Sequence, residues 1–446
     1  MEPKQRRRLA GHTARSHMNP YLAAVLLALA GAWALNALAA LLNLRALDPN
    51  LPPEFAGAYD PERYRKSQEY ARANTRLVLL RDTLGAALLA AFILWPGFPL
   101  ADAAARSLGW GELPAGLAFL LILALASELF GLPFDLYDTF VLEERFGFNR
   151  TTPATFALDK LKAWLLLLAL GGPLLAAVLA FFLHAGPLAW LWAWLATMAA
   201  LTAIQVLAPT LILPLFNRFT PLEDGPLRNA IQDLADRAGF ALSGVFVMDG
   251  SRRSAKANAF FTGLGRRKRI ALYDTLMEAH PQDQLLAVLA HEIGHFRHGH
   301  IRTRLLLSLL RLGLAFLLLS LALRQPGLHA AFGMDAVTVH GGLVFFALLY
   351  SPLSLLLSLA GNALSRRHER QADAFAARLT GDPASLARAL AALSAHNLSN
   401  LTPHPLHVAL HHAHPPALER VRSLNAMAAA ARTPSPPTGA PGPRRP

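Results

Sequence analysis

The 446-residue chain contains no cysteine and few charged residues. Without cysteine it can form no disulfide, hold no cysteine-ligated zinc and use no thiol nucleophile, so any metal would need nitrogen and oxygen ligands. Charged residues make up only 16% of the chain, whereas a soluble domain of ordinary composition carries about 25%. The deficit comes from apolar stretches whose lengths are close to the roughly 20 residues that a membrane-spanning helix needs. The composition therefore predicts a multi-pass membrane protein.

Seven apolar stretches predict transmembrane helices, because backbone polar groups in lipid must pair within their own segment. Arg81 and Asp82 interrupt the second stretch, and Pro209 and Pro214 predict a kink in the fifth. The apolar core of the first stretch exceeds the roughly 7–15 residues of a signal peptide, so we expect an uncleaved helix. The predicted spans are Tyr21–Leu42, Leu77–Trp95, Leu113–Leu132, Ala163–Phe182, Leu188–Leu215, Leu305–Leu323 and Gly342–Ala363.

The other segments complete the predicted domain organisation. Residues 1–20 form a basic arm, 21–215 hold spans one to five, 216–304 form a soluble α+β core, 305–364 hold the last two spans, 365–424 form a C-terminal segment, and the Pro-rich residues 425–446 form a disordered tail. Apolar periodicity within the soluble parts predicts helices and short strands. The helices are Pro226–Phe240, Gln282–Arg297 and a separate Ser365–Leu379, and the strands are Gly244–Met248, Asn258–Leu264 and Arg269–Leu272, the last two joined by a basic turn at Gly265–Lys268.

The formal net charge is +13, and most Lys and Arg residues lie beside the apolar stretches. This placement favours anionic lipid headgroups, not nucleic acid, as the partner of the positive charge. With seven spans, the loops 43–76 and 133–162, the soluble core and the C-terminal region share one side. That side holds most of the basic residues, so we expect it to be cytoplasmic. The basic arm would then lie on the opposite side, unless the span count is off by one or translation starts at Met18.

The pentapeptide His291-Glu292-Ile293-Gly294-His295 follows an apolar run near the end of a predicted helix. Residues four apart project from one helix face about 6 Å apart, so His291 and His295 can bind one ion together. Glu292 lies next to the first ligand and can act on a metal-bound water as general base. The alternative is two chance histidines on an amphipathic helix. The pattern favours a catalytic zinc site.

A carboxylate on a later helix would complete a site with two histidines and one glutamate, and would leave one position open for water. Glu369 is the candidate, with His368 as the rival ligand. Asp373 lies four residues further on the same helix face and could accept the second ring N–H of a ligating histidine. The competing interpretation is a solvated charged helix that leaves the membrane.

Two further histidines follow on the first metal-binding helix. His298 shares the face of His291 but lies about 10 Å from it along the axis, too far for one ion. His300 does not match the spacing of the metzincin motif. We expect both to lie around the site or at the membrane interface without binding the metal.

Several segments between about residues 53 and 424 resemble the type I CAAX prenyl protease family. The resemblance implies an integral-membrane zinc metalloendopeptidase with one zinc ion per chain. Its fold would be all-α and polytopic, with about seven transmembrane helices enclosing a water-filled chamber and a small α+β zinc-protease domain at the cytoplasmic side. The matching segments are Pro53-Glu54-Phe55, Tyr64–Gln68, Leu132–Tyr137, Glu143–Asn149, Ala257–Phe260, the His-Glu-Ile-Gly-His helix, Glu369–Asp373 and His414–Arg420.

The same resemblance implies that His291, His295 and Glu369 are zinc ligands and that Glu292 is the catalytic carboxylate. His300 matches a family histidine that is not a ligand.

It also implies roles beyond the zinc ligands. Asn258, with its neighbour Ala259, and His414 would contact the substrate backbone or the oxyanion, and Arg420 would support that end of the site. Taken alone, Asn258 would be interpreted as a turn or strand-end residue, and Arg420 as a surface charge that pairs with Glu419.

A histidine-rich segment, His404 to His414, leaves another possibility open. His407, His411 and His414 have i, i+4, i+7 spacing, which would also suit a second metal site.

The sequence thus predicts metal-assisted peptide hydrolysis, in which zinc and His414 share the developing oxyanion. The resemblance implies peptide or protein substrates with CAAX-type C-termini, with or without a lipid group. The alternative is other membrane-associated or misfolded peptides cleaved without prenyl specificity. The rivals are a transporter or channel with a structural metal and a chaperone that has lost activity. The Pro-rich end shows no evident retrieval signal, so the sequence gives no support for an endoplasmic-reticulum address. The compact form resembles bacterial relatives, so we expect a bacterial inner (plasma) membrane, with the active site facing the cytoplasm.

Overall fold

The computed structural model of the chain describes residues 19–262 and 268–432. Seven helices in these ranges are long and apolar enough to cross a membrane, as the sequence predicts. The fifth changes to π-helical geometry at η5 (Ala208–Ile212), which contains Pro209. The first four spans are α2 (Pro20–Arg45), α3 (Pro61–Leu94), α5 to α6 (Glu112–Phe146) and α7 to α8 (Pro153–His184). The fifth runs from η4 to α10 (Gly186–Phe216) and has α9 (Ala189–Leu207) at its centre. The last two are α14 (His300–Ala322) and α16 (Val339–Thr380).

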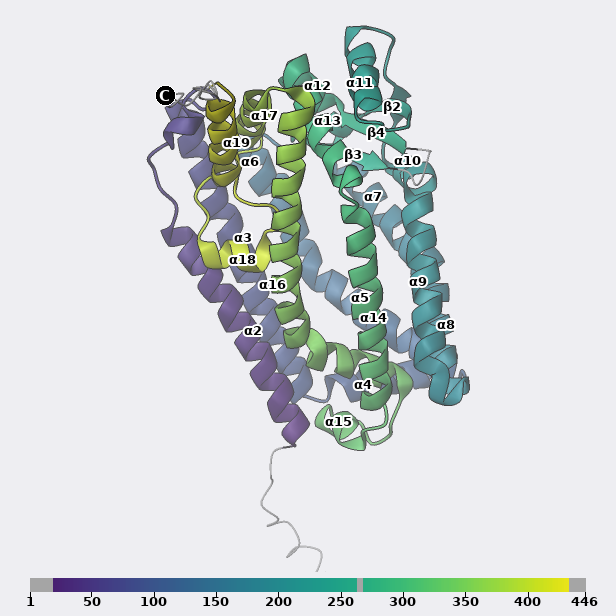
Figure 1. The fold of residues 1–446 in the computed structure, drawn as a ribbon. Coiled ribbons are helices and arrows are strands. Elements are labelled where there is room, and N and C mark those ends of the chain that lie inside the picture. The colour runs from purple at the N-terminus through teal and green to yellow at the C-terminus, as the bar shows by residue number, and fades with distance from the viewer. Residues whose placement is uncertain (1–18, 263–267, 433–446) are drawn as a thin grey trace, which may run out of the picture.

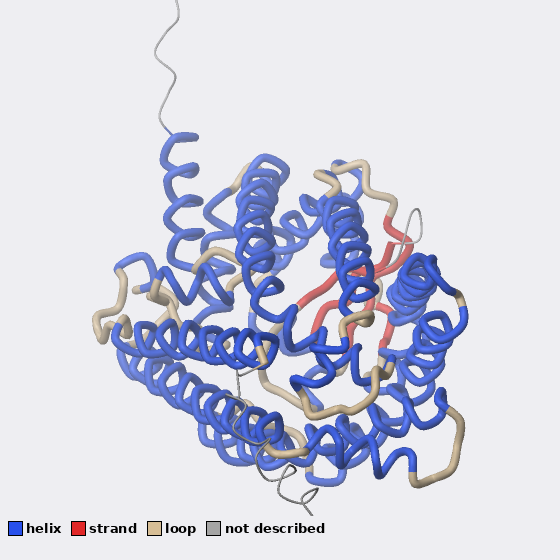
Figure 2. Tube along the Cα trace, turned by 90° about the horizontal axis from the view of Figure 1, so that it is seen from below, coloured by secondary structure: helices blue, strands red, loops and turns tan. Residues whose placement is uncertain are grey.

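The seven spans form a closed ring (Figure 1). Helix α2 contacts α3, α3 contacts α5, and the contacts continue through α8, α9, α14 and α16 back to α2. Only 0–22% of the residues in the apolar window of each span are buried. A solid bundle would bury a continuous stripe of every helix, so the spans are loosely packed over these windows, although α16 also contacts α5 and α8. Figure 2, viewed from below, shows the strands of the far end between the surrounding helices.

Several charged side chains on the second, third and fourth spans pair with one another. Arg81 lies 3.2 Å from Asp135, and Lys160 lies 2.7 Å from both Glu128 and Asp135. An ionised side chain at membrane depth is costly unless it is paired or faces water. The charge of Arg81, which interrupts the second predicted span, is therefore compatible with that span crossing the membrane.

A small α+β domain lies at one end of the ring, at the top in Figure 1. Its four-stranded sheet has the order β1-β2-β4-β3. Val245 lies opposite Ile270 in the parallel β2–β4 pair, and Ala259 lies opposite Leu272 in the antiparallel β3–β4 pair. The strands are β1 (Phe219–Pro221), β2 (Leu242–Met248), β3 (Ala259–Thr262) and β4 (Lys268–Tyr273). Most of the predicted turn at 265–268 falls outside the described residues, and the three residues of β1 are too few to give a periodic signal.

Helix α16 corrects the prediction of a separate helix at Ser365–Leu379. It runs unbroken for 42 residues to Thr380 and is followed by Gly381, whose φ is +72°. The change from apolar to charged residues near Ser365 marks where the helix leaves the apolar layer, but no helix-breaking residue stands there. The shorter helices are α4 (Gly97–Arg106), α11 (Pro226–Arg237), α12 (Asp274–Ala279), α13 (Gln282–Arg297), α15 (Pro326–Ala331), α17 (Pro383–His396), α18 (Pro405–His411) and α19 (Ala417–Arg432).

The C-terminal helix α19 corrects a second boundary. Residues 425–432 are helical, although the sequence predicts that a disordered tail begins at 425. This stretch is rich in alanine, the strongest helix former. The rest of the predicted tail, 433–446, and the basic arm before Asn19 lie outside the described residues. Helix α2 begins at the end of the ring opposite the α+β domain (Figure 1), as an odd number of spans requires.

Candidate active site

Helix α13 brings the His-Glu-Ile-Gly-His segment to the centre of the α+β domain. It buries Leu285, Leu289 and Ile293, which are spaced by four residues, in the domain core. Asp283 lies in its first turn, 3.1 Å from Arg388. The hydrogen bond from Arg388 holds the pKa of the Asp283 carboxyl below its ordinary value. The carboxylate therefore stays ionised at a helix N-terminus, where negative charge is favourable.

Helix α16 passes against α13 at Gly294. A methyl group at this glycine would lie 3.1 Å from Ala372 Cα and 3.2 Å from Phe375 Cβ. Ala372 itself is fully buried. The absence of a side chain at Gly294 thus lets the two helices approach closely, which brings Glu369 on α16 opposite the two histidines of α13.

We expect the Gly294→Ala variant to separate these helices and to weaken both folding and zinc affinity. The contacts are tight and involve backbone, so overpacking should cost about 1–3 kcal/mol. The measurements are thermal unfolding of the detergent-solubilised protein and zinc affinity by competition with a chelator. Gly361→Ala is the matched control, because a Cβ at Gly361 of α16 meets no atom within 4 Å. An unchanged melting temperature and zinc affinity for Gly294→Ala would contradict this account of the close approach.

Three side chains converge where the helices meet. His291 Nε2 and His295 Nε2 lie 3.2 Å apart, and they lie 3.4 and 3.2 Å from the two carboxylate oxygens of Glu369. Among the described residues this is the one group of three possible metal ligands that lie within 4.8 Å of one another.

The group suits a zinc ion. Glu369 is fully buried, and neither of its oxygens accepts a hydrogen bond of normal geometry. A buried carboxylate that accepts no hydrogen bond of normal geometry is costly, and a cation among the three side chains would reduce that cost. Two imidazole nitrogens and one carboxylate are the protein ligands of many catalytic zinc sites, which keep a further position open. The residues present therefore fit the metal.

Asp373 and Arg420 orient the first histidine. His291 lies with Nδ1 2.8 Å from Asp373 Oδ1, so donation of its N–H to Asp373 directs the Nε2 lone pair toward the ligand group. Arg420 donates two hydrogen bonds to Asp373, of 2.9 and 2.6 Å, and its Nη1 lies 3.7 Å from Glu369 Oε2. Its side chain is 10% exposed. Arg420 thus contacts the carboxylates beneath the site, and a contact with substrate stays a prediction.

A second chain of contacts orients the other histidine. His295 Nδ1 lies 3.0 Å from His300 Nδ1, and His300 Nε2 lies 3.0 Å from Gln371 Oε1. If His300 donates its Nε2–H to Gln371, its Nδ1 accepts the Nδ1–H of His295, and His295 Nε2 is left free for the metal. The rival ligand His368 stacks on His300 at 3.9 Å and is not among the three converging side chains. No local sequence signal identifies Gln371, because its partner lies 71 residues away.

His414, Asn258 and Ala259 lie around this centre. His414 Nδ1 lies 2.8 Å from Glu369 Oε2, and its side chain is 65% exposed toward a cavity of about 620 Å³. Asn258 is exposed, and its Oδ1 accepts a hydrogen bond from the Ala259 N–H (2.8 Å) at the start of β3. In the described structure neither Asn258 nor Ala259 makes a hydrogen bond or ion pair with the three converging side chains.

The remaining histidines of the 404–414 segment form a separate cluster. The ring centres of His407 and His411 lie 4.7 Å apart. Burial, together with neighbouring imidazoles, lowers the pKa of His407 to about 4. His414 faces Glu369 instead, so the i, i+4, i+7 trio does not converge. Within the described ranges His407 and His411 do not form part of a three-ligand group.

The fold and the site define a membrane-embedded zinc metalloprotease. The family model for the CAAX prenyl protease N-terminal region, five membrane helices, matches residues 41–218, and the model for peptidase family M48 matches residues 221–428. The chain belongs to the CAAX prenyl protease family, within peptidase family M48.

Individual relatives match over most of their length. The chain is 38% identical to CAAX prenyl protease 1 of Saccharomyces cerevisiae over 408 residues, covering 85% of this chain and 89% of the yeast protein. It is 32% identical to the CAAX prenyl protease 1 homolog of Homo sapiens, again covering 85% and 89%. The crystal structure of S. mikatae Ste24p matches with a TM-score of 0.87 and 33% identity, over 91% of this chain and 99% of that one.

The family confirms the predicted fold class, the integral-membrane location, the proteolytic activity and the dependence on zinc. It does not support the transporter, channel or inactive-chaperone alternatives.

Proposed function

We propose that this protease cleaves CAAX-type C-termini, with His291, His295 and Glu369 as the zinc ligands and Glu292 as the general base. The main support is the convergence of two imidazoles on a buried carboxylate whose oxygens accept no hydrogen bond. The name of the yeast relative, CAAX prenyl protease 1, supports the substrate class.

Each side chain has a task in this mechanism. When bound, zinc supplies a Lewis acid that polarises the scissile carbonyl and acidifies water. Glu292, half-buried beside His291, takes a proton from the attacking water and passes it to the leaving amine. His414 contacts Glu369 through Nδ1, so its other ring nitrogen can donate a hydrogen bond to the oxyanion that develops at the carbonyl.

The substrate backbone would bind beside β3. This strand is at the edge of the described sheet, and Asn258 and Ala259 stand at its start. An extended peptide can add to such an edge by main-chain hydrogen bonds. Arg420 would act at this end by holding Asp373 and, through it, His291.

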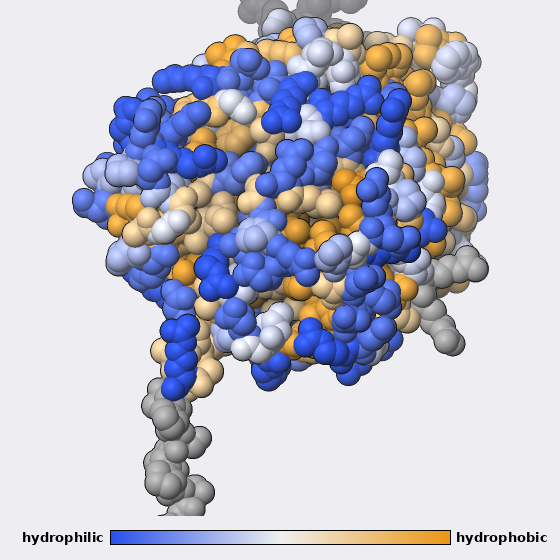
Figure 3. Space-filling view, turned by 90° about the horizontal axis from the view of Figure 1, so that it is seen from above, coloured by the Kyte–Doolittle hydropathy of each residue, from blue (hydrophilic) through white to orange (hydrophobic). Residues whose placement is uncertain are grey.

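We also propose that the site faces the cytoplasm and that the positive charge of this side contacts anionic lipid headgroups. The loops on the side of the α+β domain hold most of the Lys and Arg residues, and hydrophilic residues cover much of that face in Figure 3. The relatives named above are eukaryotic, so a bacterial plasma membrane is a prediction of the sequence alone.

A pair of peptides tests the substrate class. Both have the same CAAX-type sequence, and only one carries a prenyl group on its cysteine. We expect the prenylated peptide to be cleaved with a kcat/KM at least about tenfold higher, because burial of an isoprenoid chain against the apolar side chains of the spans removes apolar surface from water. Equal cleavage of the two would contradict prenyl specificity and would favour a broader protease of membrane-associated or misfolded peptides.

A further inference from the structure

A polar stripe on α14 continues from the zinc site into the membrane. His300, at the start of α14, contacts His295. At 100° per residue, Arg304, Ser308 and Arg311 lie on the same helix face as His300. The opposite face carries exposed leucines suited to lipid: Leu306, Leu310, Leu317 and Leu321. Since charged residues of membrane helices face the protein interior or water, the stripe faces the inside of the ring.

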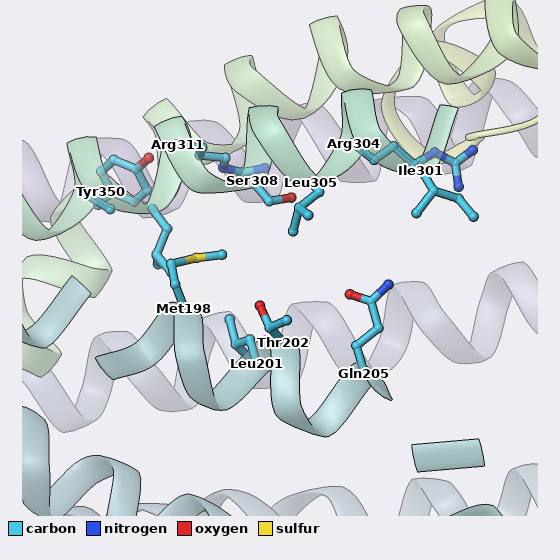
Figure 4. A pocket seen from close by; sticks show the side chains of 12 residues that line it. Met198, Leu201, Thr202, Gln205, Ile301, Arg304, Leu305, Ser308, Arg311 and Tyr350 are labelled. Atoms are coloured by element: carbon cyan, nitrogen blue, oxygen red, sulfur yellow. The ribbon is translucent and has the colours of Figure 1, made fainter. Parts of the chain in front are cut away.

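The stripe lines a cavity of about 540 Å³ between α9, α14 and α16 (Figure 4). Its walls are largely aliphatic, with Leu201 from α9 and Ile301 and Leu305 from α14. In Figure 4, Gln205 projects from α9 toward the end of α14 that carries Ile301 and Arg304. The cavity thus combines an apolar wall with a cation and an amide at the end nearer the zinc site.

The two arginines of this cavity have no acidic partner among the described residues. Arg304 donates a hydrogen bond of 3.2 Å to Ser365, and Arg311 donates one of 2.5 Å to Ser354. By contrast, Arg81 and Lys160 on other spans are paired with carboxylates. An arginine without a counter-ion in an apolar cavity is suited to bind the carboxylate of a ligand through its planar fork of donors.

Of the two arginines, Arg304 lies closer to the zinc site. Its partner Ser365 precedes Glu369 by four residues of α16, about 6 Å along the helix. If cleavage of a CAAX-type C-terminus removes its last three residues, the released segment spans about 10 Å when extended. Arg304 therefore lies about one tripeptide from the zinc site. Arg311 lies about 10 Å further along α14, beyond the reach of such a segment.

We propose that Arg304, assisted by Gln205, binds the C-terminal carboxylate of the substrate, while the aliphatic walls bind the side chains of the last residues. This inference rests on the proposed function and specifies its substrate chemistry: a short aliphatic C-terminal segment with a free α-carboxylate. Arg304 is then a residue that determines specificity, and it takes no part in hydrolysis itself.

The test compares two prenylated peptides of one sequence, one ending in a free acid and one in a carboxamide. For the wild type we expect kcat/KM to be at least about tenfold higher for the acid, as for a hydrogen bond to a charged group. Arg304→Gln should lower kcat/KM for the acid to that for the amide, and leave the amide value within about twofold. Arg304→Lys, which keeps the charge, should retain part of the preference.

Two variants are matched controls. Arg302→Gln removes an exposed charge from the leucine face of α14, and Arg311→Gln removes the distant arginine of the cavity. Both should keep the preference for the acid. Equal cleavage of acid and amide by the wild type, or an unchanged preference in Arg304→Gln at normal zinc content, would overturn the inference and leave the proposed function intact. Cleavage of neither peptide by the wild type would overturn the proposed function, and the inference with it.

Discussion

The Glu292→Gln variant is expected to lose peptide hydrolysis by at least about 10³-fold and to keep its zinc. Removal of a positioned general base costs roughly 10²–10⁴-fold, and Glu292 would handle both the proton of the water and that of the leaving amine. The change keeps the shape of the side chain, and Glu292 is not among the three side chains that converge at the site. Zinc binding should therefore remain at the wild-type level.

Initial rates on a fluorogenic peptide, with zinc content measured on the same preparations, provide the readout. Glu278→Gln is the matched control, because Glu278 is an exposed acid on α12 of the same domain. It should retain wild-type activity. Substantial turnover by Glu292→Gln would show that another group accepts the proton.

Removal of Glu369, the proposed third ligand, should have the second large effect, on metal binding. We expect Glu369→Ala to weaken zinc affinity by more than about 100-fold, because loss of an outer partner alone costs about 10–100-fold. Asp373→Ala should weaken zinc affinity by only about 10–100-fold, since Asp373 acts through the ring orientation of His291. The measurement is zinc competition with chelators of graded affinity.

The relative zinc affinities of the two variants distinguish the role of Glu369 from that of Asp373. If Asp373→Ala lost zinc as completely as Glu369→Ala, Asp373 would have to bind the metal directly. If Glu369→Ala kept wild-type affinity, His368 or a residue of the 404–414 segment would have to be the third ligand.

The sequence predicts the histidine pair well because both residues lie on one helix, where a spacing of four fixes their separation. Glu369 is predictable for a related reason: a carboxylate on a later helix is what two histidines and an open position require. The spans are predictable because a bilayer imposes length and composition on every crossing helix. In each case the sequence signal comes from residues close together in the chain or from the length and composition that the bilayer requires.

Contacts between distant segments could not be predicted in this way. Gln371 and His300 meet only because α16 packs against the start of α14, and the close approach of α13 and α16 depends on Gly294. The continuity of α16 was obscured by its change of composition near Ser365, which resembles a boundary. The position of Arg420 follows from family resemblance, but its two hydrogen bonds to Asp373 become visible only in three dimensions.

The most direct test is the zinc content per chain of four purified proteins, measured by mass spectrometry after passage over a weak chelator. They are the wild type, Glu292→Gln, Glu369→Ala and the His291→Ala/His295→Ala double variant. We predict one zinc ion per chain for the first two and almost none for the others. Full zinc occupancy in Glu369→Ala or in the double histidine variant would contradict the assignment of His291, His295 and Glu369 as the metal site.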